Sequence, residues 1–166
     1  MNIVHRQIDF VKDKEYVLER HCRINYECDC PWAREIEYED YRKDWFSLKN
    51  QVNGFYGYLE RTSKDSRTIA EIIEDENGCI IGYIWVPFCF DEESGFAFAD
   101  IQDIYIEENY RESGLATKLI SYAEDNARRS GAKVIRSGTG CDNIKSIRLH
   151  EKLGYYQYRY EFEKVL

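Results

Sequence analysis

The chain has 166 residues, a formal net charge of −8 and a pI near 5.0. Its length is that of one domain with a single sizeable core. A nucleic-acid-binding protein needs a basic surface to neutralise phosphates, so we expect no nucleic-acid partner. The longest apolar run, Cys79 to Phe90, contains Gly82 and Pro87 and is too short to span a bilayer, so we expect no membrane partner. An acidic field attracts cationic molecules such as amines, although such a charge can also serve solubility alone.

Six cysteines are present, but the N-terminus carries His5, Arg6 and Asp9 where a signal peptide would be apolar. We therefore expect a cytoplasmic protein with reduced thiols. Cys28-x-Cys30 has no matching second pair, so we expect no metal site.

The first elements are a strand and a helix. Residues 2–9 mix apolar and polar positions as a first strand does. Asp9 or Asp13 can cap a helix that runs towards Cys22. The stretch from Glu27 to Glu37 is acidic and contains a proline, which predicts a loop.

Aromatic side chains of the next segment are candidates for a substrate-binding wall: Trp32 in the loop, and Tyr56 and Tyr58 near Gly54 and Gly57, where glycine weakens a helix by about 1 kcal/mol. The segment itself predicts one amphipathic helix, because apolar residues recur at steps of three and four. That face comprises Tyr41, Trp45, Leu48, Val52, Phe55 and Leu59.

The middle of the chain reads as antiparallel strands. Thr68 to Ile73 and Cys79 to Phe90 flank Asn77-Gly78, which is a strong hairpin signal. A further turn leads into a strand from Phe96 to Ile106.

A glycine turn then joins this strand to a helix over Leu115 to Arg129, which ends before Gly131. Ala132 to Ser137 forms a short strand, and the resulting βαβ unit requires parallel strands. Backbone N–H groups at a helix start suit a pyrophosphate, and Gly114 lets the main chain approach it closely.

The last elements are a helix and a strand. Asp142 or Asn143 can cap a helix through Leu153, with His150 on the face towards the protein. Tyr155 to Phe162 alternates as a final strand does.

Two motifs resemble those of the GNAT acetyltransferase superfamily. Arg111, Gly114 and Ala116 match its R-x-x-G-x-[GA] signature, and the segment from Asn143 to Tyr155 is similar to the segment that follows this signature in the family. The resemblance implies an α/β fold of layered α+β type: a mixed, mostly antiparallel sheet with a central splayed parallel strand pair, flanked by helices. It implies one domain over residues 1–166, with a variable substrate-binding part at 1–65 and an acetyl-CoA-binding core at 66–166.

The resemblance also implies acetyl-CoA as the acetyl donor, with its pyrophosphate on the turn and its pantetheine amides on the preceding strand. The positions that carry over as cofactor-binding are Ile104, Tyr105, Ile106, Arg111, Glu112, Ser113, Gly114, Leu115, Ala116, Thr117, Asn143 and Ser146.

The family's reaction is direct attack of an amine on the thioester. An amine of pKa ~10.4 is almost wholly ammonium at neutral pH, so a base is needed. Asp100 stands where the family keeps an acidic residue and is the first candidate. Asp103 is its competitor: the two point to opposite faces of a regular strand, but a bulge, often present here in the family, would break the alternation.

The departing thiolate needs a proton, which the family commonly takes from a tyrosine on the helix after Asn143. His150 occupies that position and can donate as histidinium, or it can be a packing residue. Tyr155, Tyr105 and solvent are reserve donors.

The sequence thus predicts an N-acetyltransferase for a small cationic amine, such as an aminoglycoside or polyamine. A protein lysine or N-terminal acetyltransferase and a non-catalytic acetyl-CoA sensor are the alternatives. We expect a monomer or homodimer.

Overall fold

The computed structural model describes residues 2–29, 35–162 and 164. In this part of the chain the strands form two sheets. The larger sheet has the order β1-β2-β3-β6, with β1 at Ile3–Gln7, β2 at Ile69–Asp75, β3 at Ile80–Val86 and β6 at Asp103–Ile106. The smaller sheet has the order β4-β5-β7, with β4 at Phe88–Asp91, β5 at Phe96–Ile101 and β7 at Val134–Ser137.

The strand pairs are antiparallel except for β5 and β7, which run parallel with Phe98 opposite Val134. Helix α4 (Leu115–Arg129) connects the parallel pair. The predicted mixed, mostly antiparallel arrangement with one parallel strand pair is therefore confirmed, but the strands lie in two sheets and β7 is at the edge of the smaller one. The β2–β3 hairpin is also confirmed, and Gly78 in its turn has φ 78°.

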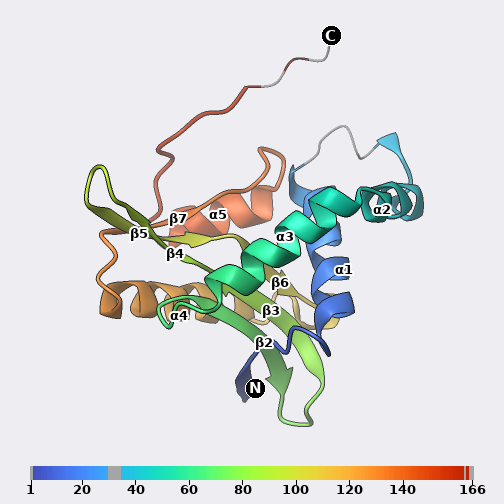
Figure 1. The fold of residues 1–166 in the computed structure, drawn as a ribbon, viewed down its shortest axis with the longest axis horizontal. Helices are drawn as coiled ribbons and strands as arrows, with labels where there is room; N and C mark the ends of the chain where they lie inside the picture. The colour runs from blue at the N-terminus through green and yellow to red at the C-terminus, as the bar shows by residue number, and fades with distance from the viewer. Residues whose placement is uncertain (1, 30–34, 163, 165–166) are drawn as a thin grey trace.

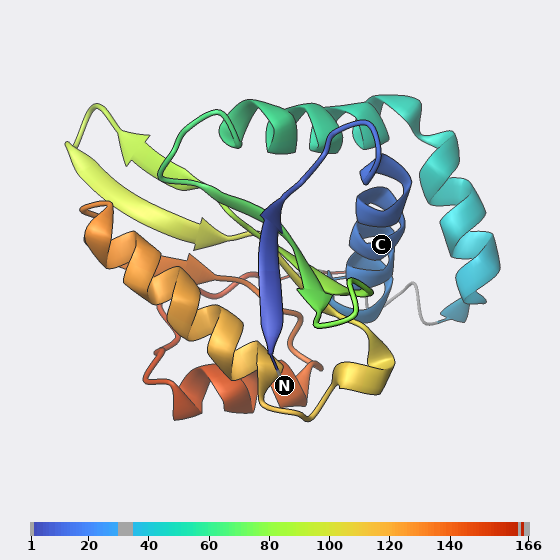
Figure 2. The same cartoon turned by 90° about the horizontal axis from the view of Figure 1, so that it is seen from below.

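Helices cover both faces of the sheets (Figures 1 and 2). On one face lie α1 (Lys14–Ile24), α2 (Tyr38–Ser47) and α3 (Lys49–Thr62); α4 lies on the other, and α5 (Ile144–Lys152) follows β7. Two clusters of buried side chains follow from this layering. Leu59, Tyr83 and Trp85 belong to the cluster under α1 to α3, and Ile84 and Leu119 to the cluster under α4. No helix in the described ranges is long and apolar enough to cross a membrane.

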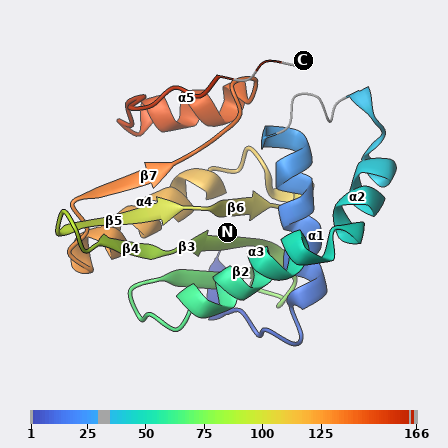
Figure 3. The same ribbon diagram turned by 45° about the horizontal axis from the view of Figure 1, so that its top comes forward.

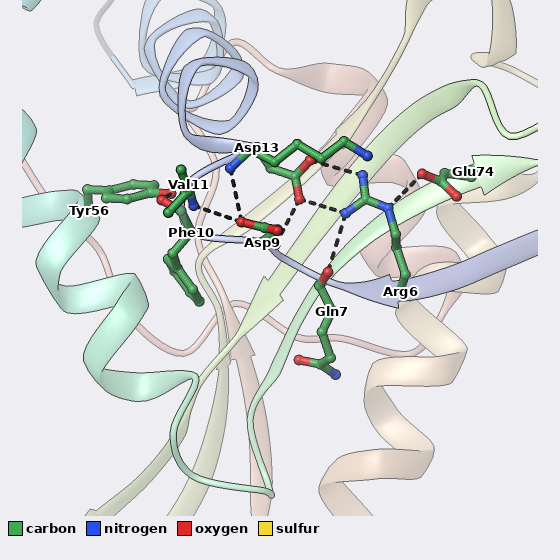
Figure 4. A network of polar contacts seen from close by, with 9 residues as sticks. Arg6, Gln7, Asp9, Phe10, Val11, Asp13, Tyr56 and Glu74 are labelled. Atoms are coloured by element: carbon green, nitrogen blue, oxygen red, sulfur yellow. Dashed lines mark hydrogen bonds and ion pairs between the residues drawn. The ribbon is translucent and has the colours of Figure 1, made fainter.

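The corner between β1 and α1 is fixed by a buried ion pair (Figure 4). The Asp13 carboxylate, 2% exposed, accepts two hydrogen bonds from the Arg6 guanidinium, at 2.6 and 2.9 Å, and one from the N–H of Asp9 at 2.8 Å. Arg6 also donates to Glu74 on β2 at 2.6 Å. Asp13 is the N-cap residue of α1, one of the two alternatives predicted, but its side chain makes no capping hydrogen bond because it accepts from Arg6. Asp9 accepts from the N–H groups of Val11 and Lys12 in the turn before the helix.

The segment predicted as one amphipathic helix is two helices, α2 and α3, which meet at Leu48 with φ −80° and ψ 66°. The Leu48 side chain is 53% exposed, so its place on the apolar face was wrong. Gly54 and Gly57 lie inside α3 and do not end it. The corner lets Trp45 of α2 and Leu59 of α3 both enter the core under the helical layer.

Two other expectations about local structure are wrong. The predicted loop from Glu27 to Glu37 is wrong for Glu27 to Asp29, which belong to a short π-helix, η1 (Asn25–Asp29), that continues directly from α1; residues 30–34 lie outside the described residues. The predicted final strand is absent from residues 155–162, which form no element and run away from the sheets in Figure 1. Along this run Tyr156, Tyr160 and Phe162 are exposed, so it lacks the apolar support that a strand needs.

The predicted strand from Phe96 to Ile106 is interrupted by a bulge, which divides it into β5 and β6. Gln102 donates its N–H to the carbonyl of Trp85 at 3.1 Å, and Asp103 is also paired with Trp85, so two residues oppose one. The extra residue reverses the alternation of side chains. Ile101 faces α4, and Asp103 faces the helices on the other side.

Candidate active site

The two sheets part at this bulge. Figure 3 shows β5 and β6 in one line, with β7 beside β5 only. Among the described residues, no strand pairs with the edge of β6 that faces away from β3, so this edge is open. Glu107 donates its N–H to Ile81 of β3 at 2.9 Å, and since such bonds alternate along an antiparallel strand, Ile104 and Ile106 turn their main-chain groups to the open edge. This edge can pair with amide groups of an extended ligand.

The chain turns sharply between β6 and α4, after the 3₁₀ turn η3 (Glu108–Tyr110). Glu112 has φ 63° and Gly114 has φ 83°, both left-handed. Ser113 donates its hydroxyl to the carbonyl of Tyr110 at 2.7 Å. The first intrahelical bond of α4 is made by the N–H of Lys118, so the preceding N–H groups, those of Leu115, Ala116 and Thr117, lack helical acceptors and carry the positive end of the helix dipole. Free N–H groups at a helix N-terminus can bind an anion such as a diphosphate.

Arg111 does not extend towards this turn but folds back over the end of β6. Its Nε donates to the carbonyl of Ile106 at 2.9 Å, its guanidinium lies 5.4 Å from the ring centre of Tyr105, and Glu27 is 3.7 Å away. Arg111 thus stabilises the strand end. Tyr105 is a residue of β6, and its side chain is buried against the helices α1 to α3.

Asp100 faces the layer of α1 to α3, because its neighbours Ala99 and Ile101 pack under α4. Gln102 donates to its carboxylate at 2.7 Å. Burial raises the pKa of Asp100, which makes it a better proton acceptor than an exposed aspartate. Tyr58 of α3 lies close by: burial, and then the charges of Cys89 and Asp100, raise the pKa of its phenol.

Asp103 lies on the same face as Asp100 but is 3% exposed. Its Oδ2 accepts a hydrogen bond from the Tyr83 hydroxyl at 2.6 Å and lies 2.9 Å from Nδ1 of His21 on α1. A carboxylate that is 3% exposed and holds both Tyr83 and His21 is poorly placed to bind an acceptor molecule directly. His21 was not among the residues predicted from the sequence, because no motif surrounds it.

His150 connects α5 to β7. Its Nδ1 lies 2.8 Å from the carbonyl of Ser146 and its Nε2 lies 2.9 Å from the hydroxyl of Ser137. The ring of Tyr155 packs edge-on against it at 5.0 Å. The hydroxyl of Tyr155 is buried without a hydrogen-bond partner, and burial raises its pKa, so it is a poor proton donor.

Strands β6 and β7 are not paired with each other, which leaves a gap between them. Asn143 lies in the loop after β7, on the far side of this gap from β6. Its side-chain oxygen caps α5 by accepting from the N–H of Ser146 at 3.2 Å, as predicted, and its amide nitrogen lies 3.1 Å from the sulfur of Cys28 in η1. A Cβ atom at Gly140 would lie 1.6 Å from the carbonyl oxygen of Cys28. The η1 segment therefore packs directly on the loop that follows β7, and only glycine fits at this contact.

Three aromatic side chains were candidates for a substrate-binding wall. Of the two that the structure describes, Tyr58 lies near Asp100 and Tyr56 does not. Tyr56 is 7% exposed and donates its hydroxyl to the carbonyl of Phe10 at 2.9 Å, so it is part of the core near the β1–α1 corner. Trp32 lies outside the described residues. A surface hollow of about 360 Å³ opens at the end of β6, lined by charged and tyrosine side chains that include Arg20 and Glu107, which are paired at 2.8 Å.

Comparison with known proteins shows the family. Residues 25–155 match the profile of the Acetyltransferase (GNAT) family. The chain belongs to this family. The parting strand pair, the turn at Gly114 and the capped helix α5 are thus parts of a GNAT domain, and the fold inferred from the two motifs is confirmed.

Relatives of this GNAT chain act on different amines. The L-methionine sulfoximine/L-methionine sulfone acetyltransferase of Salmonella typhimurium (strain LT2) is 34% identical over 88 residues, covering 51% of this chain and 48% of the relative. The L-amino acid N-acyltransferase MnaT of Escherichia coli (strain K12) is 31% identical over 98 residues, covering 55% and 54%. The chain spans about half the length of these relatives.

A solved structure shows the same fold over the whole chain. AAC(6')-Iy in complex with a bisubstrate analog, CoA-S-monomethyl-acetylneamine, has a TM-score of 0.62 at 16% identity, and the alignment covers 100% of this chain and 99% of the other.

Proposed function

We propose that this GNAT protein transfers the acetyl group of acetyl-CoA to a primary amine of a small molecule. The observation that carries the proposal is the conjunction of an open β6 edge with the left-handed turn at Gly114, because together they suit an extended chain of amides that ends in a diphosphate. Acetyl-CoA, when bound, supplies the activated acetyl group. The main chain of Ile104 and Ile106 would hold its pantetheine arm, and the turn its pyrophosphate.

Asp100 has the properties required to take a proton from the amine. The acceptor arrives mainly as ammonium, which a carboxylate attracts, and the half-buried carboxylate of Asp100 has a raised pKa. Tyr58 of α3 forms the wall beside it, with its ring 5.2 Å from that of Trp85. In this proposal Asp100 binds the ammonium and accepts its first proton.

The net charge of −8 favours a cationic acceptor, such as an aminoglycoside or polyamine. The named relatives instead acylate amino acids or their analogues. Both classes carry a primary amine and differ in whether a carboxylate accompanies it. A comparison of the two classes therefore identifies the acceptor.

The test is release of CoA thiol from acetyl-CoA across three sets of amines: aminoglycosides, polyamines, and amino acids that include methionine sulfone. We expect turnover with at least one set. Asp100→Asn should lower kcat by roughly 100-fold or more, since general base catalysis contributes about 10²–10⁴-fold. The matched control is Asp125→Asn on the exposed side of α4, where the carboxylate pairs with Arg128 at the surface, and it should leave kcat unchanged.

Other outcomes would point elsewhere. Tight acetyl-CoA binding without turnover of any amine would indicate a sensor. Acetylation of lysine-bearing peptides in preference to every small amine would indicate a protein acetyltransferase.

A further inference from the structure

His21 of α1 lies on the same side of the sheet as Asp100, against Asp103 of β6, and the proposed function assigns it no role. Its Nδ1 lies 2.9 Å from Asp103, and its ring stacks on Phe55 of α3 with the ring centres 3.5 Å apart. Trp45 packs edge-on against it at 5.9 Å. These contacts fix the orientation of the ring and leave its other nitrogen, Nε2, on the side of Asn25.

The partners of His21 determine which ring nitrogen carries the proton. Burial, followed by the charge of Asp103, raises the pKa of Tyr83 well above its ordinary value, so this hydroxyl keeps its proton and donates to Asp103. Asp103 is therefore an acceptor, and Nδ1 of His21 is its second donor. The side-chain nitrogen of Asn25 lies 3.3 Å from Nε2 and is itself a donor, so Nε2 carries a lone pair that accepts from Asn25. An acceptor molecule must displace Asn25 to reach this lone pair.

His21 also lies where the sheet opens. Asp103, which holds it, follows the bulge residue Gln102. From His21 the chain continues through η1 to Cys28, which contacts Asn143 on the far side of the gap at 3.1 Å. The segment from His21 to Cys28 therefore runs from Asp103 of β6 to the loop after β7, past the β6 edge that the proposed function assigns to acetyl-CoA.

Acetylation of a primary ammonium requires two proton acceptors. The ammonium nitrogen carries three protons and the amide nitrogen of the product carries one. Asp100 can accept the first proton, and a second base can take the other proton from the nitrogen before it passes to the thiolate or to solvent. A histidine held by a carboxylate through Nδ1 is a well-suited acceptor, because the carboxylate fixes the tautomer and stabilises the imidazolium.

We propose that Nε2 of His21 accepts the second proton from the acceptor nitrogen, and that Asp103 is the positioning residue that orients the ring. The inference rests on the proposed N-acetylation. In the balanced step the nitrogen–carbon bond forms, and the carbon–sulfur bond breaks with its electron pair on sulfur. Two protons leave the nitrogen, one proton goes to the thiolate, and one is released to solvent.

The principal variant is His21→Asn, whose amide can still donate to Asp103, so that the buried carboxylate keeps a partner. We expect kcat to fall by roughly 100-fold while KM for acetyl-CoA is unchanged. The matched control is His5→Asn. His5 lies 2.8 Å from Glu71 in a similar histidine–carboxylate contact on β1, away from the gap, and its substitution should leave kcat unchanged.

Two further variants separate a chemical role from a structural one. In His21→Ala, imidazole added to the solution can occupy the space on Phe55 and should restore part of kcat. In Asp103→Asn the ring is still present but poorly oriented, so kcat should fall without a change in KM for the amine, and imidazole should not restore it. If the alanine variant fails to fold, the asparagine variants retain the test.

The outcomes distinguish this inference from the function on which it rests. An active wild-type protein together with a His21→Asn variant within about threefold of its kcat would overturn the role of His21 alone; a difference of about threefold is well below the roughly 10²-fold minimum for a proton-transfer group. A wild-type protein that acetylates none of the amines would overturn the proposed function, and the role of His21 with it.

Discussion

Asp100 of β5 and Asp103 of β6 are three positions apart and face the same helical layer, yet their surroundings give them different chemistry. Asp100 is half-buried, with one neutral hydrogen-bond donor, Gln102, so its charge is available to a ligand. Asp103 is buried and engaged by Tyr83 and His21. The bulge places both carboxylates on one face, and burial then decides which of them can meet an amine.

The raised pKa of Asp100 leads to a prediction about the pH dependence of activity. The base must be ionised, and the substrate form that binds is the ammonium. The acid limb of kcat/KM should therefore lie above the ordinary aspartate pKa of ~3.9, followed by a plateau up to the pKa of the amine. A pH profile at constant ionic strength measures this limb. The residual activity of Asp100→Asn should lack it, and a limb that persists in that variant would assign it to another group.

His150 gives a second prediction at this scale. Nδ1 must donate to the Ser146 carbonyl, so in neutral His150 Nε2 accepts from Ser137 and has no proton to give. We expect His150→Gln to lower kcat less than about tenfold, below the usual contribution of a general acid. Steady-state kinetics measure the change in kcat, and a thermal melt serves as the control for folding. A loss of about 100-fold or more in a normally folded variant would make His150 the donor to the thiolate.

At the scale of elements, the turn before α4 has a left-handed glycine at the N-terminus of a helix. Gly114 has φ 83° and stands at the N-terminus of α4, and Gly131 has φ 82° just beyond its C-terminus. A Cβ atom added at either glycine would meet no other atom within 4 Å, so substitution strains only the backbone at both.

The two glycines make a matched pair for a prediction. Gly114→Ala and Gly131→Ala should each destabilise the fold by about 1 kcal/mol, the usual cost of a left-handed alanine. Only Gly114→Ala should raise KM for acetyl-CoA, because it perturbs the N–H groups that the proposal assigns to the pyrophosphate. Denaturant titration and steady-state kinetics give the two readings. An equal rise of KM in both variants would contradict the assignment.

Local patterns predicted most elements because they depend on neighbours in the chain. The helix at Leu115–Arg129 has an apolar face and a glycine at each end, and the Asn77-Gly78 hairpin has its turn chemistry in two residues. The bulge at Gln102 depends on the register against Trp85, which no local pattern contains. The break at Leu48 likewise depends on how α2 and α3 both reach the core, and the long apolar repeat concealed it.

The candidate site divides in the same way. The glycine turn and the cap at Asn143 are local, and the sequence predicted both. The roles of Tyr56 and His21 depend on which distant strand or loop their helices approach. Tyr56 reaches Phe10, and His21 reaches Asp103 across 82 positions of the chain. Such contacts come from packing and cannot be predicted from spacing.

At the scale of the whole molecule, the layer of α1 to α3 is fixed to the sheet at one corner by the Arg6–Asp13 pair. Arg6→Ala would leave the Asp13 carboxylate, 2% exposed, without its cation, and we expect a loss of about 3 kcal/mol in the free energy of unfolding. The control is Arg128→Ala, which breaks exposed pairs with Glu124 and Asp125 and should cost less than about 1 kcal/mol. Urea titration measures both. Equal losses would show that the corner contributes no more than a surface pair.

The same corner makes stability depend on pH. Burial alone would raise the pKa of Asp13, but the hydrogen bonds and charge of Arg6 lower it overall. Asp13 therefore adds stability above its unfolded pKa of ~3.9, and this contribution disappears as the pH falls through the lower value of the folded state. In Arg6→Ala the acid-side decline in stability should be shallower.

The open edge of β6 has a consequence for exchange of amide hydrogens with solvent. The N–H groups of Asp103 and Tyr105 lie on the side paired with β3, whereas those of Ile104 and Ile106 do not. Deuterium should therefore enter alternate positions of a single strand at different rates. If acetyl-CoA pairs with this edge, its addition should slow labelling at Ile104 and Ile106 and leave their neighbours unchanged, so a mass spectrum would report the binding mode without an amine or a turnover assay.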